Sequence, residues 1–119
     1  MVLTISDAAE ASGLTAHTLR YYERAGLMLD PVARAVSSHR RYTDEDLRWV
    51  ELLTKLRATG MPIRRMREYA DLVRAGEGTE AARLALLEEH RDAVLRQLDE
   101  MRSNLAAIEK KIEIYRQKG

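Results

Sequence analysis

Cationic and phenolic side chains recur at helical spacing in residues 15–27, TAHTLRYYERAGL. Leu19 and Tyr22 are three positions apart and can share one face of a helix. The other face would then present His17, Arg20, Tyr21 and Arg24. A short helix with such an exposed face suits insertion into a DNA groove, although an amphipathic helix with a solvated charged face is the commoner source of this pattern.

The flanking residues mark the ends of this helix and of one before it. Thr15 suits the N-cap, and Gly26 suits the left-handed residue that ends a helix. Residues 4–12, TISDAAEAS, form another candidate helix, and Gly13 follows it. Small residues in that segment allow close packing, so the pair predicts a helix-turn-helix. Tyr22 is ambiguous, because its ring can pack in the core while its hydroxyl binds a phosphate.

Two long windows in the first half of the chain contain no acidic residue. They are residues 31–43, PVARAVSSHRRYT, and residues 52–67, LLTKLRATGMPIRRMR. A third of the chain is charged and acids nearly equal bases, so such clustering is not expected by chance. Each window can face phosphates without local repulsion. The alternative is a pair of solvated basic loops.

The first window lacks helical periodicity and begins with a turn signal at Asp30 and Pro31. We expect residues 27–29 and 40–42 to pair as a short hairpin with a flexible tip between them. A helix-turn-helix followed by a basic hairpin is a winged helix. Its wing would reach the DNA backbone or the minor groove beside the recognition helix.

Two more helices are predicted after the wing. One restarts at Thr43, which three acidic residues follow in the first turn. The next begins near Pro62. Arg64 and Arg65 at its start oppose the helix dipole, and a bound phosphate would remove this small cost.

Apolar residues then repeat in steps of four and three from Leu84 to Tyr115. The apolar heptad a and d positions, our candidate dimerisation residues, are Leu84, Leu87, Val94, Leu98, Met101, Leu105, Ile108, Ile112 and Tyr115. Arg91 is the exception in the seam. At 1.5 Å per residue the seam is about 48 Å long. No upstream segment is long enough to cover it in an antiparallel hairpin, so we expect a homodimer.

A glycine-rich break at residues 76–78 divides the chain into a DNA-binding domain, residues 1–76, and a dimerisation helix, residues 79–116. Zero cysteines exclude disulfides, thiolate metal sites and a cysteine nucleophile. The chain lacks both the ~18 apolar residues of a membrane span and a signal-peptide pattern. No phosphate-binding glycine loop or Ser/His/Asp cluster is present. We therefore expect a cytoplasmic non-enzyme without a membrane partner.

Over nearly its whole length the chain resembles the MerR family of bacterial transcription regulators. The resemblance rests on TLRYYERAGL at 18–27, RRYTDEDL at 40–47 and TGMPIRRMRE at 59–68, followed by the heptads. The first two segments at this spacing are quite specific together. The resemblance implies a mainly α fold: a winged helix-turn-helix domain and a long helix that dimerises as an antiparallel coiled coil.

The resemblance also implies which residues contact DNA. Bases or phosphates would be contacted from the recognition helix by His17, Thr18, Arg20 and Tyr21, with Tyr22 bonding the DNA backbone. The first wing would carry Arg34, Arg40 and Arg41, and the second would hold phosphates through Arg64 and Arg65. Three further candidates within the same segments are Thr15, His39 and Tyr42. The dimer would bind a palindromic promoter site and distort it, so that RNA polymerase can recognise both promoter elements.

Two family features are missing from the sequence. Metal-sensing members carry cysteines at the end of the dimerisation helix, and drug-binding members add a C-terminal effector domain. We expect neither metal nor cofactor. The chain is then a compact regulator, a fragment of a longer protein, or a regulator with a small pocket at the dimer interface. Arg91 would pair with an acid across the dimer rather than bind an anionic ligand. Alternative functions are a coiled-coil interaction module and an architectural DNA binder without effector sensing.

Overall fold

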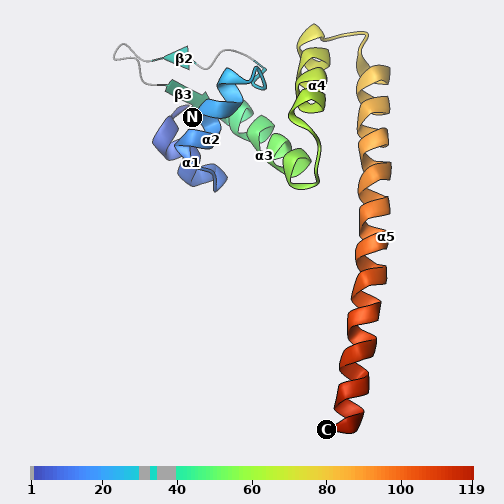
Figure 1. The fold of residues 1–119 in the computed structure, drawn as a ribbon. Helices are drawn as coiled ribbons and strands as arrows, with labels where there is room; N and C mark the ends of the chain where they lie inside the picture. Colours follow the sequence, from blue (N-terminus) through green and yellow to red (C-terminus); the bar gives the residue numbers. More distant parts are fainter. Residues whose placement is uncertain (1, 30–32, 35–39) are drawn as a thin grey trace. The chain divides into compact units, whose positions relative to one another are not determined.

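The computed structural model describes residues 2–29, 33–34 and 40–119, with the side chains of residues 33, 34, 40 and 41 outside this description. Among these residues five helices and three short strands form, so the predicted mainly α class is confirmed (Figure 1). Two compact units follow one another, Met1–Arg83 and Leu84–Gly119. Their division lies a few residues beyond the predicted break at residues 76–78.

The predicted helix-turn-helix forms near the N-terminus (Figure 1). Its helices are α1 (Ile5–Ser12) and α2 (Ala16–Arg24). Thr4 and Thr15 are the two N-caps, and each side-chain oxygen accepts a hydrogen bond from the backbone N–H three residues later. Gly13 ends α1 with φ 73°, a left-handed conformation that a glycine adopts without strain. Ala8 and Leu19 have no exposed surface, so the small alanine lets the two helices pack closely.

Three short strands form an antiparallel sheet in the order β1-β3-β2. They are β1 (Val2–Thr4), β2 (Ala33–Arg34) and β3 (Arg40–Thr43). The predicted hairpin has the right second strand, but Arg34 rather than residues 27–29 lies opposite Arg40. Leu27 and Met28 are buried instead, and their carbonyl oxygens accept side-chain hydrogen bonds, so this backbone forms no strand.

Two packed helices follow the sheet, α3 (Asp44–Ala58) and α4 (Ile63–Ala75). Thr43 and Asp46 form a capping box: the Asp46 N–H donates to the Thr43 hydroxyl at 3.1 Å, and the Thr43 N–H donates to the Asp46 carboxylate at 2.9 Å. Such a cap contributes about 1 kcal/mol. Trp49 of α3 stacks on Tyr69 of α4 with ring centroids 5.6 Å apart. The aromatic pair therefore joins the two helices within the core.

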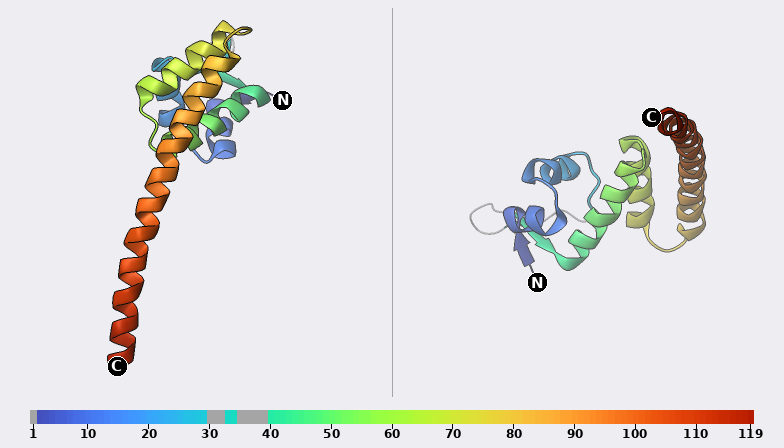
Figure 2. Two further views of the ribbon diagram at one scale, coloured as in Figure 1. Left: turned by 90° about the vertical axis from the view of Figure 1, so that its right-hand side faces the viewer. Right: turned by 90° about the horizontal axis from the view of Figure 1, so that it is seen from below.

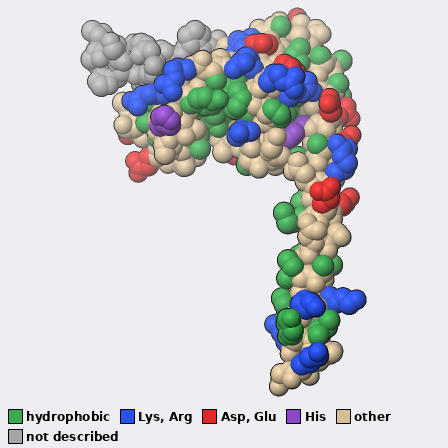
Figure 3. Space-filling view, viewed as in Figure 1, with side chains coloured by type: hydrophobic (Ala, Val, Ile, Leu, Met, Phe, Trp, Pro, Cys, Tyr) green, Lys and Arg blue, Asp and Glu red, His purple; other side chains and the backbone are tan. Residues whose placement is uncertain are grey.

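The long helix α5 (Glu80–Lys118) runs without a break (Figure 2). Most of the seam side chains are exposed over 43% to 67% of their surface, and Leu87 and Val94 are half-buried. Figure 3 shows apolar side chains at intervals along this helix. None of the described helices is long and apolar enough to span a membrane. The single chain thus leaves an apolar surface without cover on α5.

Candidate nucleic-acid interface

The helix α2 has one buried and one exposed face, as its spacing predicted. Leu19 is fully buried and Tyr22 is 5% exposed, so both rest in the core. On the other side, the exposed residues are His17, Arg20, Tyr21 and Arg24. Guanidinium, imidazole and phenol groups on one exposed face can donate hydrogen bonds to base edges and to phosphates. This face has the chemistry of a recognition helix.

Thr15 and Thr18 stand at the start of the same helix. The Thr15 hydroxyl accepts from the Thr18 N–H at 3.1 Å and lies 3.0 Å from the Thr18 hydroxyl. Thr15 is exposed and Thr18 is half-buried. Thr15 therefore caps α2, and its hydroxyl lies beside that of Thr18 in the first turn of the helix.

Tyr42 lies in the core rather than at the surface. It has no exposed surface, and its hydroxyl donates to the carboxylate of Glu23 in the last turn of α2. A fully buried side chain does not meet a ligand without rearrangement, so this placement does not fit the predicted DNA contact. Tyr42 instead links β3 to the last turn of α2.

The basic wing residues are described only in part. Arg34 lies opposite Arg40, and Arg41 lies opposite both Ala33 and Thr4, so the wing backbone is held in the sheet. The side chains of these arginines are outside the described set, as is the whole of His39. Their DNA contacts therefore stay predictions.

The two arginines at the start of α4 have different surroundings. Arg64 is exposed, whereas Arg65 pairs with Glu68 one turn later at 2.5 Å. Pro62 is the N-cap and provides no side-chain hydrogen bond to the first turn. An uncapped helix start beside an exposed arginine suits a phosphate, because backbone N–H groups and the helix dipole both favour an anion. Arg65 would have to share its charge with Glu68.

Three hydrogen bonds hold the segment that follows α2, and sequence reasoning missed all of them. Side chains of α3 and α4 donate to three carbonyls within residues 25–28: Trp49 Nε1 to Leu27 at 2.7 Å, Arg67 Nε to Ala25 at 2.8 Å and Arg74 Nη1 to Met28 at 2.6 Å. The spacing of seven between the arginines places them on one face of α4. Their acceptors are backbone atoms, which a sequence does not mark.

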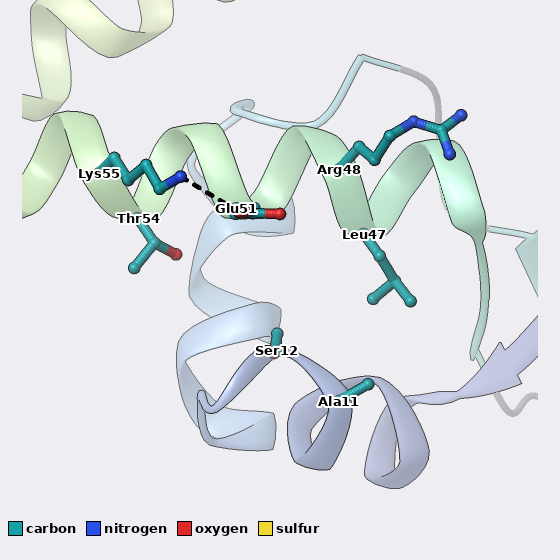
Figure 4. A pocket seen from close by; sticks show the side chains of 7 residues that line it. All are labelled: Ala11, Ser12, Leu47, Arg48, Glu51, Thr54 and Lys55. Carbon is teal, nitrogen blue, oxygen red and sulfur yellow. Dashed lines mark hydrogen bonds and ion pairs between the residues drawn. The ribbon is translucent and has the colours of Figure 1, made fainter.

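A surface pocket of about 450 Å³ lies between the end of α1 and the outer face of α3 (Figure 4). Its lining residues are Ala11, Ser12, Leu47, Arg48, Glu51, Thr54 and Lys55. Lys55 donates to Glu51 at 3.1 Å, and both side chains are exposed. The walls mix both charges and share no residue with the exposed face of α2. Among the described residues, no group of three or more His, Cys, Asp or Glu could hold a metal ion.

Comparisons with known proteins agree with this geometry. The protein-family model described as "MerR HTH family regulatory protein" matches residues 3–72, and the family model described as "MerR, DNA binding" matches residues 47–111. An uncharacterised HTH-type transcriptional regulator of Haemophilus influenzae is 37% identical over 115 residues, which is 97% of this chain and 84% of the relative. The regulator AdhR of Bacillus subtilis is 40% identical over 93 residues, 78% of this chain and 66% of AdhR.

A solved structure is similar over nearly the whole chain. It is the crystal structure of HiNmlR, a MerR family regulator lacking the sensor domain, bound to promoter DNA. The TM-score is 0.88 at 37% identity, and the match covers 98% of this chain and 92% of that one. Two family models, curated relatives and this structure all agree. The chain therefore belongs to the MerR family of transcription regulators.

Proposed function

We propose that this MerR-type regulator binds promoter DNA as a homodimer and so controls transcription. The exposed face of α2 carries the proposal, because it presents Arg20, His17 and Tyr21 (41% exposed) while the opposite face is buried. The DNA-bound structure of HiNmlR, at 37% identity, supports it. These comparisons favour a regulator over a protein-interaction module.

Base and phosphate contacts would come from different elements. The α2 face would meet base edges in the major groove and supply specificity. Phosphates would meet the wing arginines Arg34, Arg40 and Arg41 with His39, and Arg64 and Arg65 at the start of α4. These phosphate contacts would release counterions and make affinity depend steeply on salt.

The second copy of the chain would cover the α5 seam. Leu98, Leu105 and Ile112 are each at least 43% exposed, and burying such side chains against a partner helix is favourable. The antiparallel arrangement implied by the family would place two α2 faces on the half-sites of a palindrome. Arg91 interrupts the seam but already pairs with Asp92 at 3.0 Å and with Glu88 at 4.0 Å. Its charge is balanced within its own helix, so we do not assign it an anionic ligand.

Transcription would respond to a change in DNA shape. Bending or untwisting a promoter with an overlong spacer would bring both polymerase elements onto one face, and the phosphate contacts would offset the deformation cost. RNA polymerase would then be the partner that detects the change. Because the promoter is the target, we place the protein at the nucleoid in the cytoplasm.

Selection of bound sites from a random duplex pool at moderate salt tests the proposal. Recovery of an inverted repeat by the purified protein would support it, and the half-site spacing would report the dimer geometry. Tight, salt-dependent binding without any motif would instead indicate an architectural DNA binder. If the protein binds no DNA, the coiled-coil interaction module becomes the better interpretation of its function.

Two arginine variants test the division between bases and phosphates. Arg20→Ala should weaken operator binding by roughly 1–3 kcal/mol and relax specificity at one position. Arg40→Ala with Arg41→Ala should weaken binding to all sequences alike and lower the salt slope by about one or two contacts. Binding titrations at four salt concentrations, on operator and unrelated duplexes, separate the two. A uniform loss with Arg20→Ala would make Arg20 a phosphate contact.

A further inference from the structure

The segment just after the recognition helix is held from two directions. From within, Gly26 has φ 75°, its N–H donates to the Glu23 carbonyl at 3.2 Å, and the Leu27 N–H donates to the Tyr22 carbonyl at 3.0 Å. This pattern is a Schellman motif, which satisfies carbonyls in the last turn. From outside, α4 reaches the Ala25 carbonyl, which no backbone bond of α2 satisfies.

The two donors on α4 are cations. Arg67 Nε donates to the Ala25 carbonyl at 2.8 Å, and Arg74 Nη1 donates to the Met28 carbonyl at 2.6 Å. Charged donors make stronger hydrogen bonds than neutral ones, and a cation is favourable at the negative end of a helix. Arg74 is itself held by an ion pair with Asp71. The end of α2 is thus fastened to α4 at two points 46 and 42 residues away in sequence.

The same helix α4 carries Arg64, the exposed arginine at its uncapped start. Phosphate contact at that start and base contact on α2 must be correct at the same time. A hydrogen-bonded link between the two helices fixes their relative placement before DNA arrives, which lowers the ordering cost of binding. Contacts that fix placement contribute to specificity without adding a phosphate contact.

We propose that Arg67 and Arg74 are positioning residues that lock the recognition helix to α4, so that operator discrimination depends on them although neither contacts DNA. The proposal rests on the DNA-binding function given above. It separates Arg67 from its neighbours in the acid-free window of residues 52–67, where basic residues are otherwise candidates for phosphate contact.

The test is the ratio of operator affinity to affinity for an unrelated duplex, measured across salt concentrations. Arg67→Met and Arg74→Met keep an apolar stem but remove the carbonyl bond. Each should lower the ratio roughly tenfold, the size expected for one weakened base contact. The salt slope should change by less than about 0.5, since no phosphate contact is lost. Arg48→Met is the matched control, because it removes one exposed arginine of α3 without a carbonyl bond, and it should keep the ratio.

Several outcomes would overturn the inference. A salt slope lower by about one, with equal loss on both duplexes, would make Arg67 a phosphate contact. A lower melting temperature with an unchanged ratio would leave it a purely structural residue. Should Arg67→Met not fold, Arg74→Met carries the same test, because it removes the hydrogen bond to the Met28 carbonyl; an unchanged ratio in that variant would contradict the proposal. If the wild type itself shows no operator preference, the proposed function fails instead.

Discussion

The two compact units of this chain treat their apolar residues in opposite ways. In Met1–Arg83, helices and sheet close around a core in which Leu19, Val50 and Leu53 have no exposed surface. In Leu84–Gly119, Leu86 is the one buried apolar side chain, and most seam residues are largely exposed. The first unit completes its burial within one chain, whereas the second does not.

The difference between the units shows that local hydrogen bonds suffice to form a helix, whereas burial of its apolar residues requires packing against another surface. An α-helix satisfies its own backbone, so α5 can form along its whole length from local hydrogen bonds and good helix formers. Its apolar seam gains nothing until another surface removes it from water. We therefore expect perturbation of the first unit to act within a chain, and perturbation of the second to act between chains.

Charges placed in the seam should have the largest effect. Leu98→Glu with Leu105→Glu would bury two carboxylates per chain, so the dimer dissociation constant should rise about 100-fold or more. Sedimentation equilibrium measures the change. Operator binding should fall with it, while the near-ultraviolet spectrum of the first unit persists.

Ser103→Glu is the control for that experiment, because it lies on the outer face of α5 between the two altered positions. It should leave the dimer intact. A double variant that still sediments as a dimer would show that the seam is not the contact, and the comparison between the units would fail.

Two matched leucine-to-alanine substitutions, one in each unit, should have smaller effects and test the same comparison. Leu53→Ala should destabilise the first unit by about 2–5 kcal/mol, because a fully buried leucine leaves a cavity. Leu105→Ala should instead shift the unfolding of α5 by an amount that depends on protein concentration. Trp49, the one tryptophan of the chain, reports on the first unit by fluorescence, and circular dichroism at 222 nm is dominated by helix.

The two variants are distinguished by whether their unfolding midpoints depend on protein concentration. Urea titrations at two protein concentrations should give the same fluorescence midpoint shift for Leu53→Ala and different dichroism shifts for Leu105→Ala. Concentration independence in both variants would show that the seam is not covered by a second chain.

The smallest effect is expected at Glu80, the first residue of α5. Hydrogen bonds from the backbone N–H groups of Glu80 and Gly78, aided by Arg83, lower the pKa of Glu80 below its ordinary value of 4.5. A lowered folded-state pKa stabilises the protein above the ordinary value, and this stabilisation is lost as the pH falls through the folded-state pKa. Glu80→Gln should therefore lower the melting temperature slightly at pH 7 and converge with wild type in acid. A difference that grows in acid would contradict this assignment.

Local patterns predicted most of the helices well. The caps at Thr15 and Thr43 and the glycine end of α2 depend on residues within one turn, and the structure confirms them. The face of α2 was predictable for the same reason, since helical spacing alone divides Leu19 from Arg20. The heptads predicted a long helix, which α5 confirms.

Non-local contacts were predicted poorly. The strand β1 was missed because its partner β3 lies about forty residues away, where Leu3 meets Tyr42. The first strand of the hairpin was misplaced because residues 27–29 are held by side chains from α3 and α4. Tyr42 was named as a DNA-contact candidate within the wing segment, but packing against α2 buries it.

By itself the sequence determined the helices, their caps, the cationic face of α2 and the apolar seam of α5. All of these follow from side-chain types at spacings of a few residues, where the geometry of a helix is known in advance. Only the tertiary structure decided that Arg67 and Arg74 donate hydrogen bonds to carbonyls just after α2, while Arg64 makes no such bond. The three side chains have the same chemistry, and they differ only in which backbone carbonyls the fold brings within their reach.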